Sequence, residues 1–143
     1  MTRLFACLLL AICTWTSAAM ADPQSQQERL KQSDAFYAAG NYTSAYQIAD
    51  ALAKEGYAPA YGRLGQLYSE GNGVAQSKML ARHWYSKGAE NGDVMSTYNM
   101  GIYNDVGIAG PKDPTAALAY YKRAADLGDA KGAFNAGQML VTG

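Results

Sequence analysis

The segment AYGRLGQLY at residues 60–68 holds the first copy of a pattern that returns 36 residues later. Its Leu64-Gly65 pair becomes Met100-Gly101 in the next copy, and a third glycine follows at Gly137. Two other sets of glycines keep the same step, namely Gly56, Gly92 and Gly128, and Gly71, Gly107 and Gly143. Three coincident registers indicate a tandem repeat, and a period of roughly 20–50 residues is typical of solenoids and arrays.

Each repeat contains two helical patterns. In the second half, small and apolar residues recur at i, i+3, i+4, i+7 and i+8, which predicts a helix with one buried stripe. The two sets are Ala81, Trp84, Tyr85, Gly88 and Ala89, then Ala117, Tyr120, Tyr121, Ala124 and Ala125. A glycine inside a helix costs about 1 kcal/mol relative to alanine. We therefore predict that Gly65, Gly101 and Gly137 each lie where a neighbouring helix comes close.

Residues that begin and end helices stand in the same register. Side chains that can cap a first turn recur every 36 residues, and glycines suited to a left-handed helix end follow each second helix. The caps are Asn41, Ser77 and Asp113, with Pro114 at a first helical position, and the ends are Gly92 and Gly128, followed by capping Asp93 and Asp129. We expect seven helices, near residues 26–39, 42–55, 58–70, 78–91, 94–106, 114–127 and 130–141.

The first 21 residues have the features of a secretory signal peptide. Arg3 supplies the positive start, the apolar run 4–13 is too short to span a bilayer as a helix, and Ala19-Met20-Ala21 forms a cleavage pattern. We expect a cut after Ala21 and a periplasmic or secreted mature chain, residues 22–143. The alternative is a lipoprotein anchored at Cys13, although Ile12 is larger than the residue that usually precedes a lipidated cysteine.

Composition excludes several functional classes. Hydrophobic residues make up 49 % and charged residues 17 %, and loss of Arg3 leaves 11 basic against 12 acidic residues. A net charge of −1 without a basic cluster argues against nucleic-acid binding. Both cysteines precede residue 22, and His83 is the only histidine. We therefore expect no disulfide, no His/Cys metal site, no cofactor, and no transmembrane segment after the signal peptide.

These residues resemble the Sel-1-like repeat family, a relative of tetratricopeptide repeats. The resemblance rests on residues 60–68, on Gly71-Asn72-Gly73-Val74, and on residues 81–92. It implies an all-α fold, an α/α superhelical solenoid of helix pairs. We divide the chain into a signal peptide at 1–21 and a helical repeat domain at 22–143. That domain contains a tetratricopeptide-like unit at about 26–57, repeats at 58–93 and 94–129, and a partial repeat or cap at 130–143.

The family resemblance also implies a role in protein–protein contacts, often in envelope assembly, signalling or host interaction. Some exported relatives have cysteine-bridged units for which weak β-lactam chemistry has been discussed. A chain without cysteine after residue 21 does not carry that feature. No catalytic constellation accompanies His83, so we do not expect an enzyme.

Positions that differ between repeats are candidates for binding, since positions that recur maintain the stack. We expect the variable strip of the first helices to line a concave groove. The candidate residues are Arg63, Gln66, Tyr98, Asn99, Ile102, Asp105, Phe134 and Gln138. Arg63 is a candidate for grasping a carboxylate. The recurring aromatic-Asn pairs either hold neighbouring helices together or provide exposed anchors.

Three hypotheses of function follow. The first is an exported adaptor or scaffold that binds a segment of an envelope or secreted protein in the groove. The alternatives are a secreted effector or inhibitor that acts outside the cell, and an envelope-assembly lipoprotein. The apolar end of the chain, near Phe134 and residues 139–141, either packs inward as a cap or supports self-association or a bound partner.

Overall fold

The computed structural model describes residues 22–142, which form seven α-helices and no strand. In chain order the helices are α1 (Pro23–Ala38), α2 (Tyr42–Lys54), α3 (Ala58–Glu70), α4 (Lys78–Glu90), α5 (Val94–Val106), α6 (Pro114–Asp126) and α7 (Ala130–Thr142). The prediction of an all-α helical solenoid with seven helices is confirmed. The predicted signal peptide, its cleavage site and the alternative anchor at Cys13 lie outside the described residues.

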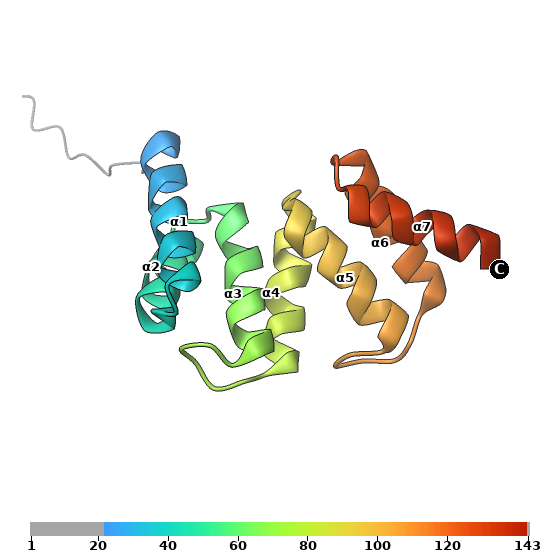
Figure 1. The fold of residues 1–143 in the computed structure, drawn as a ribbon, viewed down its shortest axis with the longest axis horizontal. Helices are drawn as coiled ribbons and strands as arrows, with labels where there is room; N and C mark the ends of the chain where they lie inside the picture. The colour runs from blue at the N-terminus through green and yellow to red at the C-terminus, as the bar shows by residue number, and fades with distance from the viewer. Residues whose placement is uncertain (1–21, 143) are drawn as a thin grey trace, which may run out of the picture.

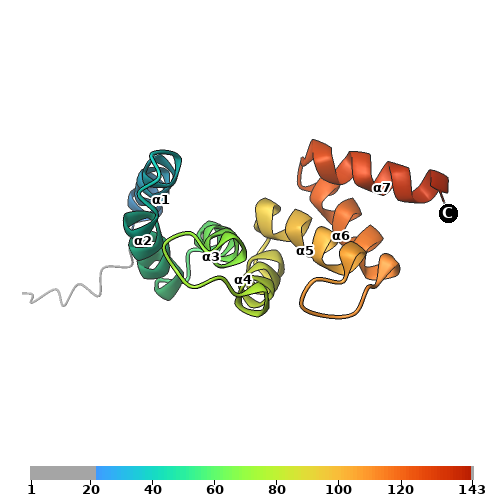
Figure 2. The same ribbon diagram turned by 60° about the horizontal axis from the view of Figure 1, so that its bottom comes forward.

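The helices form a row of antiparallel pairs (Figure 1). Each helix packs on the next one in the chain, and α3 also contacts α5, as α5 contacts α7. The first helices of successive units therefore lie beside one another, and the second helices follow the other side of the row. In Figure 2 the row is bowed, with α1 and α7 standing above α3 and α4.

The predicted caps are present. Asn41, Ser77 and Asp113 each accept a hydrogen bond from a backbone N–H in the first turn that follows, at 3.3, 3.2 and 2.9 Å. Gly92 and Gly128 adopt φ values of +80° and +95°, the left-handed conformation that glycine adopts without strain. The expected start of the first helix was wrong by three residues, because Asp22 caps α1 and Pro23 occupies its first turn.

Two of the three recurring glycines allow close helix packing. A Cβ at Gly65 would lie 2.5 Å from two ring carbons of Tyr85, and a Cβ at Gly101 would lie 2.5 Å from the same two carbons of Tyr121. Both rings are buried, with 3 % and 2 % of their surface exposed. The prediction is confirmed at these positions, where the flat face of a tyrosine on the second helix covers a glycine on the first.

The prediction is wrong at Gly137. No heavy atom lies within 4 Å of the position its Cβ would take, because no helix follows α7 among the described residues. The same cause leaves Phe134, Leu140 and Val141 largely exposed. Of the two arrangements left open by the sequence, an inward-packed cap does not form for these side chains.

No helix between residues 22 and 142 combines the length and hydropathy needed to cross a membrane. In the same part of the chain, no three His, Cys, Asp or Glu side chains are grouped so that they could hold a metal ion.

Candidate protein-binding surface

The first helices α1, α3, α5 and α7 form one side of the row, here called the first-helix face. All eight candidate residues lie on α3, α5 or α7. Their surroundings differ between the half formed by α1 and α3 and the half formed by α5 and α7.

Arg63 joins α3 to α1. Its Nε donates to Asp34 Oδ1 at 2.9 Å, its Nη2 donates to the same oxygen, and its guanidinium lies 4.7 Å from the ring centroid of Tyr37. Only 9 % of Arg63 is exposed. The carboxylate that Arg63 grasps is therefore one of this chain, and its donors are largely used inside the fold.

Gln66 belongs to the same polar network. Its Oε1 accepts from Arg63 at 2.5 Å, and its Nε2 donates to the Tyr37 hydroxyl and to Glu70 Oε1, both at 3.0 Å. The Tyr37 hydroxyl donates to Glu70 Oε2. Partial burial and the bond to Glu70 raise the pKa of Tyr37. In this half of the face, polar side chains bond mainly to one another.

The junction between α3 and α5 is closed in a similar way. Gly62 is buried, and a Cβ there would lie 2.4 Å from Asp93 Oδ2. The Tyr103 hydroxyl donates to Ser69 Oγ at 2.9 Å. Asp93 accepts from the Ser96 N–H at 2.8 Å as the cap of α5, and burial raises the pKa of its carboxyl. These contacts join α3 to α5 at this point.

Two of the candidate residues at the centre of α5, Tyr98 and Ile102, pack against neighbouring helices. Tyr98 lies 5.9 Å from Tyr121 between ring centroids and accepts a 3.4 Å hydrogen bond from Asn135 of α7. Ile102 packs against the cluster around Tyr121. Asn99 donates at 2.8 Å to the carbonyl of Met95 in its own helix. Within the aromatic-Asn pair of α5, Tyr98 therefore helps to hold α5 against α6 and α7, whereas Asn99 bonds within its own helix.

A cleft of about 430 Å³ opens between the C-terminal end of α5, the start of α6 and α7. It is lined by Asp105, Lys112, Pro114, Tyr121, Asn135, Gln138, Met139 and Thr142. The structure thus brings together Asp105 and Gln138 from the predicted strip, 33 residues apart in the chain. Burial, with a smaller contribution from Asp105, raises the pKa of Tyr121 at the cleft floor.

Sequence reasoning missed Lys112, which lies in the loop where the second repeat departs from the first. Gly107 ends α5 with φ +83°, and Ala109 also adopts a positive φ, at +54°, although it is not a glycine. Arg82 fixes this loop by donating to the Ile108 carbonyl at 3.0 Å, and the Asp113 N–H donates to the Asn104 carbonyl at 2.8 Å. In the sequence, the difference between residues 106–111 and the equivalent loop of the first repeat is the signal that this loop has a distinct role.

The remaining candidate, Phe134, is 63 % exposed and does not line the cleft. It lines a second hollow on α7, with Ala133, Gly137, Gln138, Val141 and Thr142. His83 is exposed on α4, and its ring lies 5.4 Å from that of Trp84, with no hydrogen-bonded acid or base among the described residues.

The profile of the Sel1 repeat matches residues 58–93 and residues 94–129. The chain belongs to the Sel1 repeat family. The fold of this family is one that generally mediates protein–protein interaction, and it is generally non-enzymatic.

Relatives and solved structures agree with this assignment. The human protein sel-1 homolog 2 is 37 % identical over 86 residues, which cover 60 % of this chain and 12 % of the human protein. A Sel1 repeat protein from Oxalobacter formigenes shares 25 % identity and a TM-score of 0.69, over 79 % of this chain and 88 % of that protein.

Two further structures are similar. The protective antigen c5321 of uropathogenic Escherichia coli strains, which has the same repeat fold, shares 26 % identity and a TM-score of 0.71, over 81 % of this chain and 26 % of the antigen. The cysteine-rich protein B of Helicobacter pylori shares the fold, with a TM-score of 0.60 at 14 % identity, over 79 % of this chain and 96 % of that protein.

Proposed function

We propose that this chain is an exported protein–protein interaction module, an adaptor or scaffold that binds a segment of an envelope or secreted protein. The binding site is the α5–α7 half of the first-helix face, centred on the 430 Å³ cleft. Membership of the Sel1 repeat family supports the general role in protein–protein interaction, and the residues of the cleft support the location of the binding site.

The observation that carries this assignment is the contrast in polar groups between the two halves. In the α1–α3 half, Arg63 and Gln66 bond to Asp34, Tyr37 and Glu70. In the α5–α7 half, the side chains of Asp105, Lys112 and Gln138 form no hydrogen bond or ion pair with any of residues 22–142. Groups without internal partners at a cleft are available to a ligand.

The chemistry of the cleft indicates what kind of segment fits. Asp105 supplies a carboxylate, Lys112 an ammonium group, and Gln138 an amide that both donates and accepts. Tyr121 and Met139 add apolar surface between them. A peptide segment that carries both an acidic and a basic side chain matches this arrangement, because each charge then meets the opposite charge.

Export is part of this proposal, and it rests on the sequence of residues 1–21, which has the features of a signal peptide. A secreted effector or inhibitor would share the same surface but act outside the cell, and fractionation of cells and culture medium separates the two locations. A free Asp22 at the mature N-terminus, measured by mass spectrometry, would exclude a lipid anchor at Cys13.

The test is affinity capture with the chain expressed from its full sequence, followed by binding measurements with the captured protein. The double variant Asp105→Lys plus Lys112→Glu reverses both cleft charges and keeps the net charge. We expect it to weaken binding at least about tenfold, the usual order for a lost interface charge pair. Ile102→Glu is a poorer probe, because Ile102 is part of the packed cluster around Tyr121.

The matched control is Lys122→Glu plus Asp126→Lys, which makes the same exchange of charges at two exposed positions of α6. It should bind like the unaltered protein. Equal binding by the cleft variant and the control would remove the cleft from the proposal, and absence of any captured envelope or secreted protein would contradict the proposed role.

A further inference from the structure

Two asparagines of the chain are followed directly by glycine, in the pairs Asn72-Gly73 and Asn91-Gly92. Asparagine is a chemically labile residue. In such a pair the backbone nitrogen of the glycine can attack the side-chain amide carbon, because glycine has no side chain to obstruct the approach. Asn72 lies in the loop between α3 and α4, whereas Asn91 directly follows the last turn of α4. Their surroundings decide which pair the fold leaves free to react.

Backbone hydrogen bonds hold the pair at Asn91. The Gly92 N–H, whose nitrogen would have to attack, donates to the Ala89 carbonyl at 3.1 Å. The next N–H, of Asp93, donates to the Gly88 carbonyl at 2.9 Å. Ring closure requires the glycine nitrogen to turn toward the asparagine side chain. Both bonds would then be lost, and Asp93, the cap of α5, would be displaced.

The loop that contains Asn72 has no such restraint. The Asn72 N–H donates to the Leu67 carbonyl at 3.1 Å, and the next bonded backbone N–H is that of Ser77, which donates to the Tyr68 carbonyl at 2.9 Å. The N–H groups of residues 73–76 have no hydrogen-bond acceptor among residues 22–142. The nitrogen of the glycine after Asn72 can therefore turn toward the side chain without loss of a backbone bond.

Side-chain bonds do not account for this difference. The Asn72 amide donates to Glu70 Oε2 at 2.7 Å, and the Asn91 amide donates to the Lys87 carbonyl at 2.8 Å. Each amide thus has a hydrogen bond of similar length. What distinguishes the two pairs is the backbone, which is bonded after Asn91 and free after Asn72.

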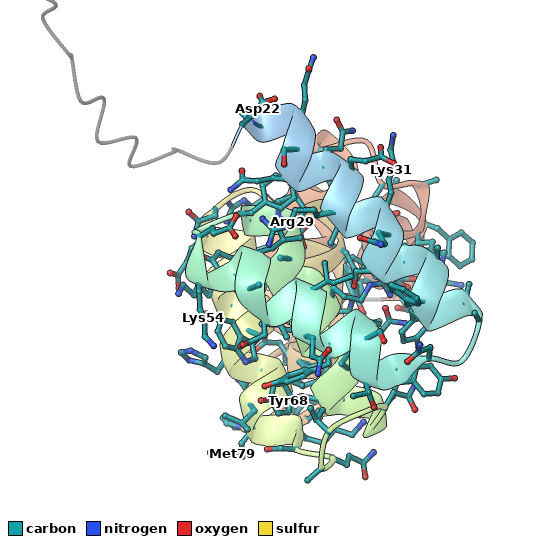
Figure 3. The ribbon with its side chains drawn as sticks, turned by 90° about the vertical axis from the view of Figure 1, so that its left-hand side faces the viewer. Asp22, Arg29, Lys31, Lys54, Tyr68 and Met79 are labelled. Atoms are coloured by element: carbon teal, nitrogen blue, oxygen red, sulfur yellow. The ribbon has the colours of Figure 1, made fainter. Side chains whose placement is uncertain are left out.

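The reactive loop lies against the first unit of the stack. Figure 3 views the molecule from the end that α1 and α2 form, and its labels Tyr68 and Met79 mark the last turn of α3 and the first turn of α4, between which the loop runs. Val74 packs against the hydrophobic cluster shared by α2 and α3. A Cβ at Gly73 would lie 2.6 Å from the Tyr42 carbonyl oxygen. Packing holds this loop, and little room is left beside it.

We propose that Asn72 is a site of spontaneous deamidation in the folded protein and that the fold protects Asn91. The Gly73 nitrogen forms a bond to Cγ of Asn72 and gives up its proton, the Cγ–Nδ2 bond breaks, and ammonia leaves a cyclic succinimide. Water then opens the ring. Attack at Cγ gives aspartate, and attack at the backbone carbonyl carbon gives isoaspartate, whose chain continues through Cβ and Cγ. The reaction consumes only water.

Either product changes the contact between the loop and α1. Glu70 Oε2, which accepts from Asn72, also accepts from the Tyr37 hydroxyl of α1. Loss of Nδ2 replaces a donor by a carboxylate oxygen, so that two negative charges face each other. Isoaspartate also lengthens the backbone beside Gly73, where the Tyr42 carbonyl leaves little space. We expect α1 to be held less firmly against α3 after the reaction.

The test follows the reaction in the protein expressed from its full sequence and kept folded in mildly alkaline buffer. Trypsin, which cleaves after lysine and arginine, places the two asparagines in separate peptides, residues 64–78 and 88–112. Mass spectrometry with fragmentation measures the conversion of each amide and separates isoaspartate from aspartate. We expect Asn72 to convert at least about tenfold faster than Asn91, which corresponds to 1.36 kcal/mol in the barrier.

Two controls accompany this measurement. In concentrated guanidinium chloride the fold no longer distinguishes the two pairs, so both asparagines should convert at similar rates. Asn72→Gln keeps an amide at the position, but its longer side chain closes a ring far less readily, so the peptide of residues 64–78 should stay unconverted at position 72.

Hydrogen exchange measures the consequence for α1. Asn72→Asp reproduces one product of the reaction. We expect the α1 amides of this variant to exchange at least about twofold faster than in freshly purified protein, a discounted value for a hydrogen bond to an exposed carboxylate. Asn91→Asp makes the same change at the exposed end of α4 and should leave exchange in α1 unchanged.

Three results would overturn the inference. One is conversion of Asn91 as fast as that of Asn72 in the folded protein. Another is conversion of Asn72 only after unfolding, and the third is a product that contains aspartate without isoaspartate, which excludes the succinimide. Unchanged α1 exchange in Asn72→Asp would contradict the weakened contact with α1. None of these measurements depends on a binding partner, so they leave the proposed function to its own test.

Discussion

Gly65 and Gly101 differ from Gly137 in their surroundings, although all three stand five residues before the end of their helix. The first two face tyrosine rings that a Cβ would approach to 2.5 Å, whereas the third faces open space. The comparison shows that the glycine is required by the covering helix and not by the helix that contains it. It also makes α7 a control for the two complete units within the same molecule.

The largest effect is expected for alanine at the covered positions. Gly101→Ala would place a methyl group against the buried Tyr121 ring, and overpacking of this kind costs about 1–3 kcal/mol. Over most of this range the cost exceeds the gain of about 1 kcal/mol that alanine brings to a helix interior. Urea unfolding should show a lower midpoint for Gly101→Ala, and likewise for Gly65→Ala. Higher midpoints for both would mean that the rings move aside freely.

An increase in stability is expected at Gly137, the glycine that no helix covers in the described structure. Gly137→Ala adds a methyl group in open space, so the helix propensity acts alone and stabilises α7 by up to about 1 kcal/mol. Because α7 is the last helix of the described stack, the gain should appear as slower hydrogen exchange of the α7 amides, with a smaller rise in Tm. Faster hydrogen exchange of the α7 amides in this variant would contradict the contrast between Gly137 and the two covered glycines.

The smallest effect concerns the caps at the start of α5 and α7. Asp93 is covered by α3 at Gly62, and burial raises the pKa of its carboxyl in the folded chain. A raised pKa means that the folded state holds the proton more tightly than the unfolded state, so this carboxyl contributes stability below its unfolded pKa of about 3.9. That contribution is lost as the pH rises through the folded pKa.

Asp93→Asn keeps an equally good capping side chain and removes the buried charge. We expect the variant to equal or exceed the unaltered protein in stability at pH 7, and its advantage to disappear below about pH 4. Denaturant unfolding across this pH range measures the difference. Asp129→Asn, the same change at the cap of α7, reports the cost of exchanging the cap itself. A variant whose advantage grew on acidification would contradict the assignment.

The repeat period was enough to predict most of the fold. The six helices α2 to α7 all begin at the expected residue, because caps and glycines recur every 36 residues. The first helix was placed three residues late. Asp22-Pro23 has the same capping pattern as Asp113-Pro114, but it was interpreted only as the boundary of the signal peptide.

The site was harder to predict than the fold. Arg63 stands where asparagine recurs, and nothing in the repeat shows that Asp34 comes within reach, because the first unit has a shorter turn and a different register. The meeting of Asp105 with Gln138 follows from equivalent first helices lying side by side. Lys112 lies in a loop outside the repeat pattern, so its position depends on contacts such as the one between Arg82 and Ile108.

The row of helix pairs in Figure 1 has one consequence for how such a chain can change in length. Since the main contacts join neighbouring helices, with α3–α5 and α5–α7 in addition, no single core has to be rebuilt when a block of 36 residues is gained or lost. Addition at one end converts an outer helix into an inner one. During evolution the length of the stack can therefore change while the packing between the existing neighbouring helices is preserved.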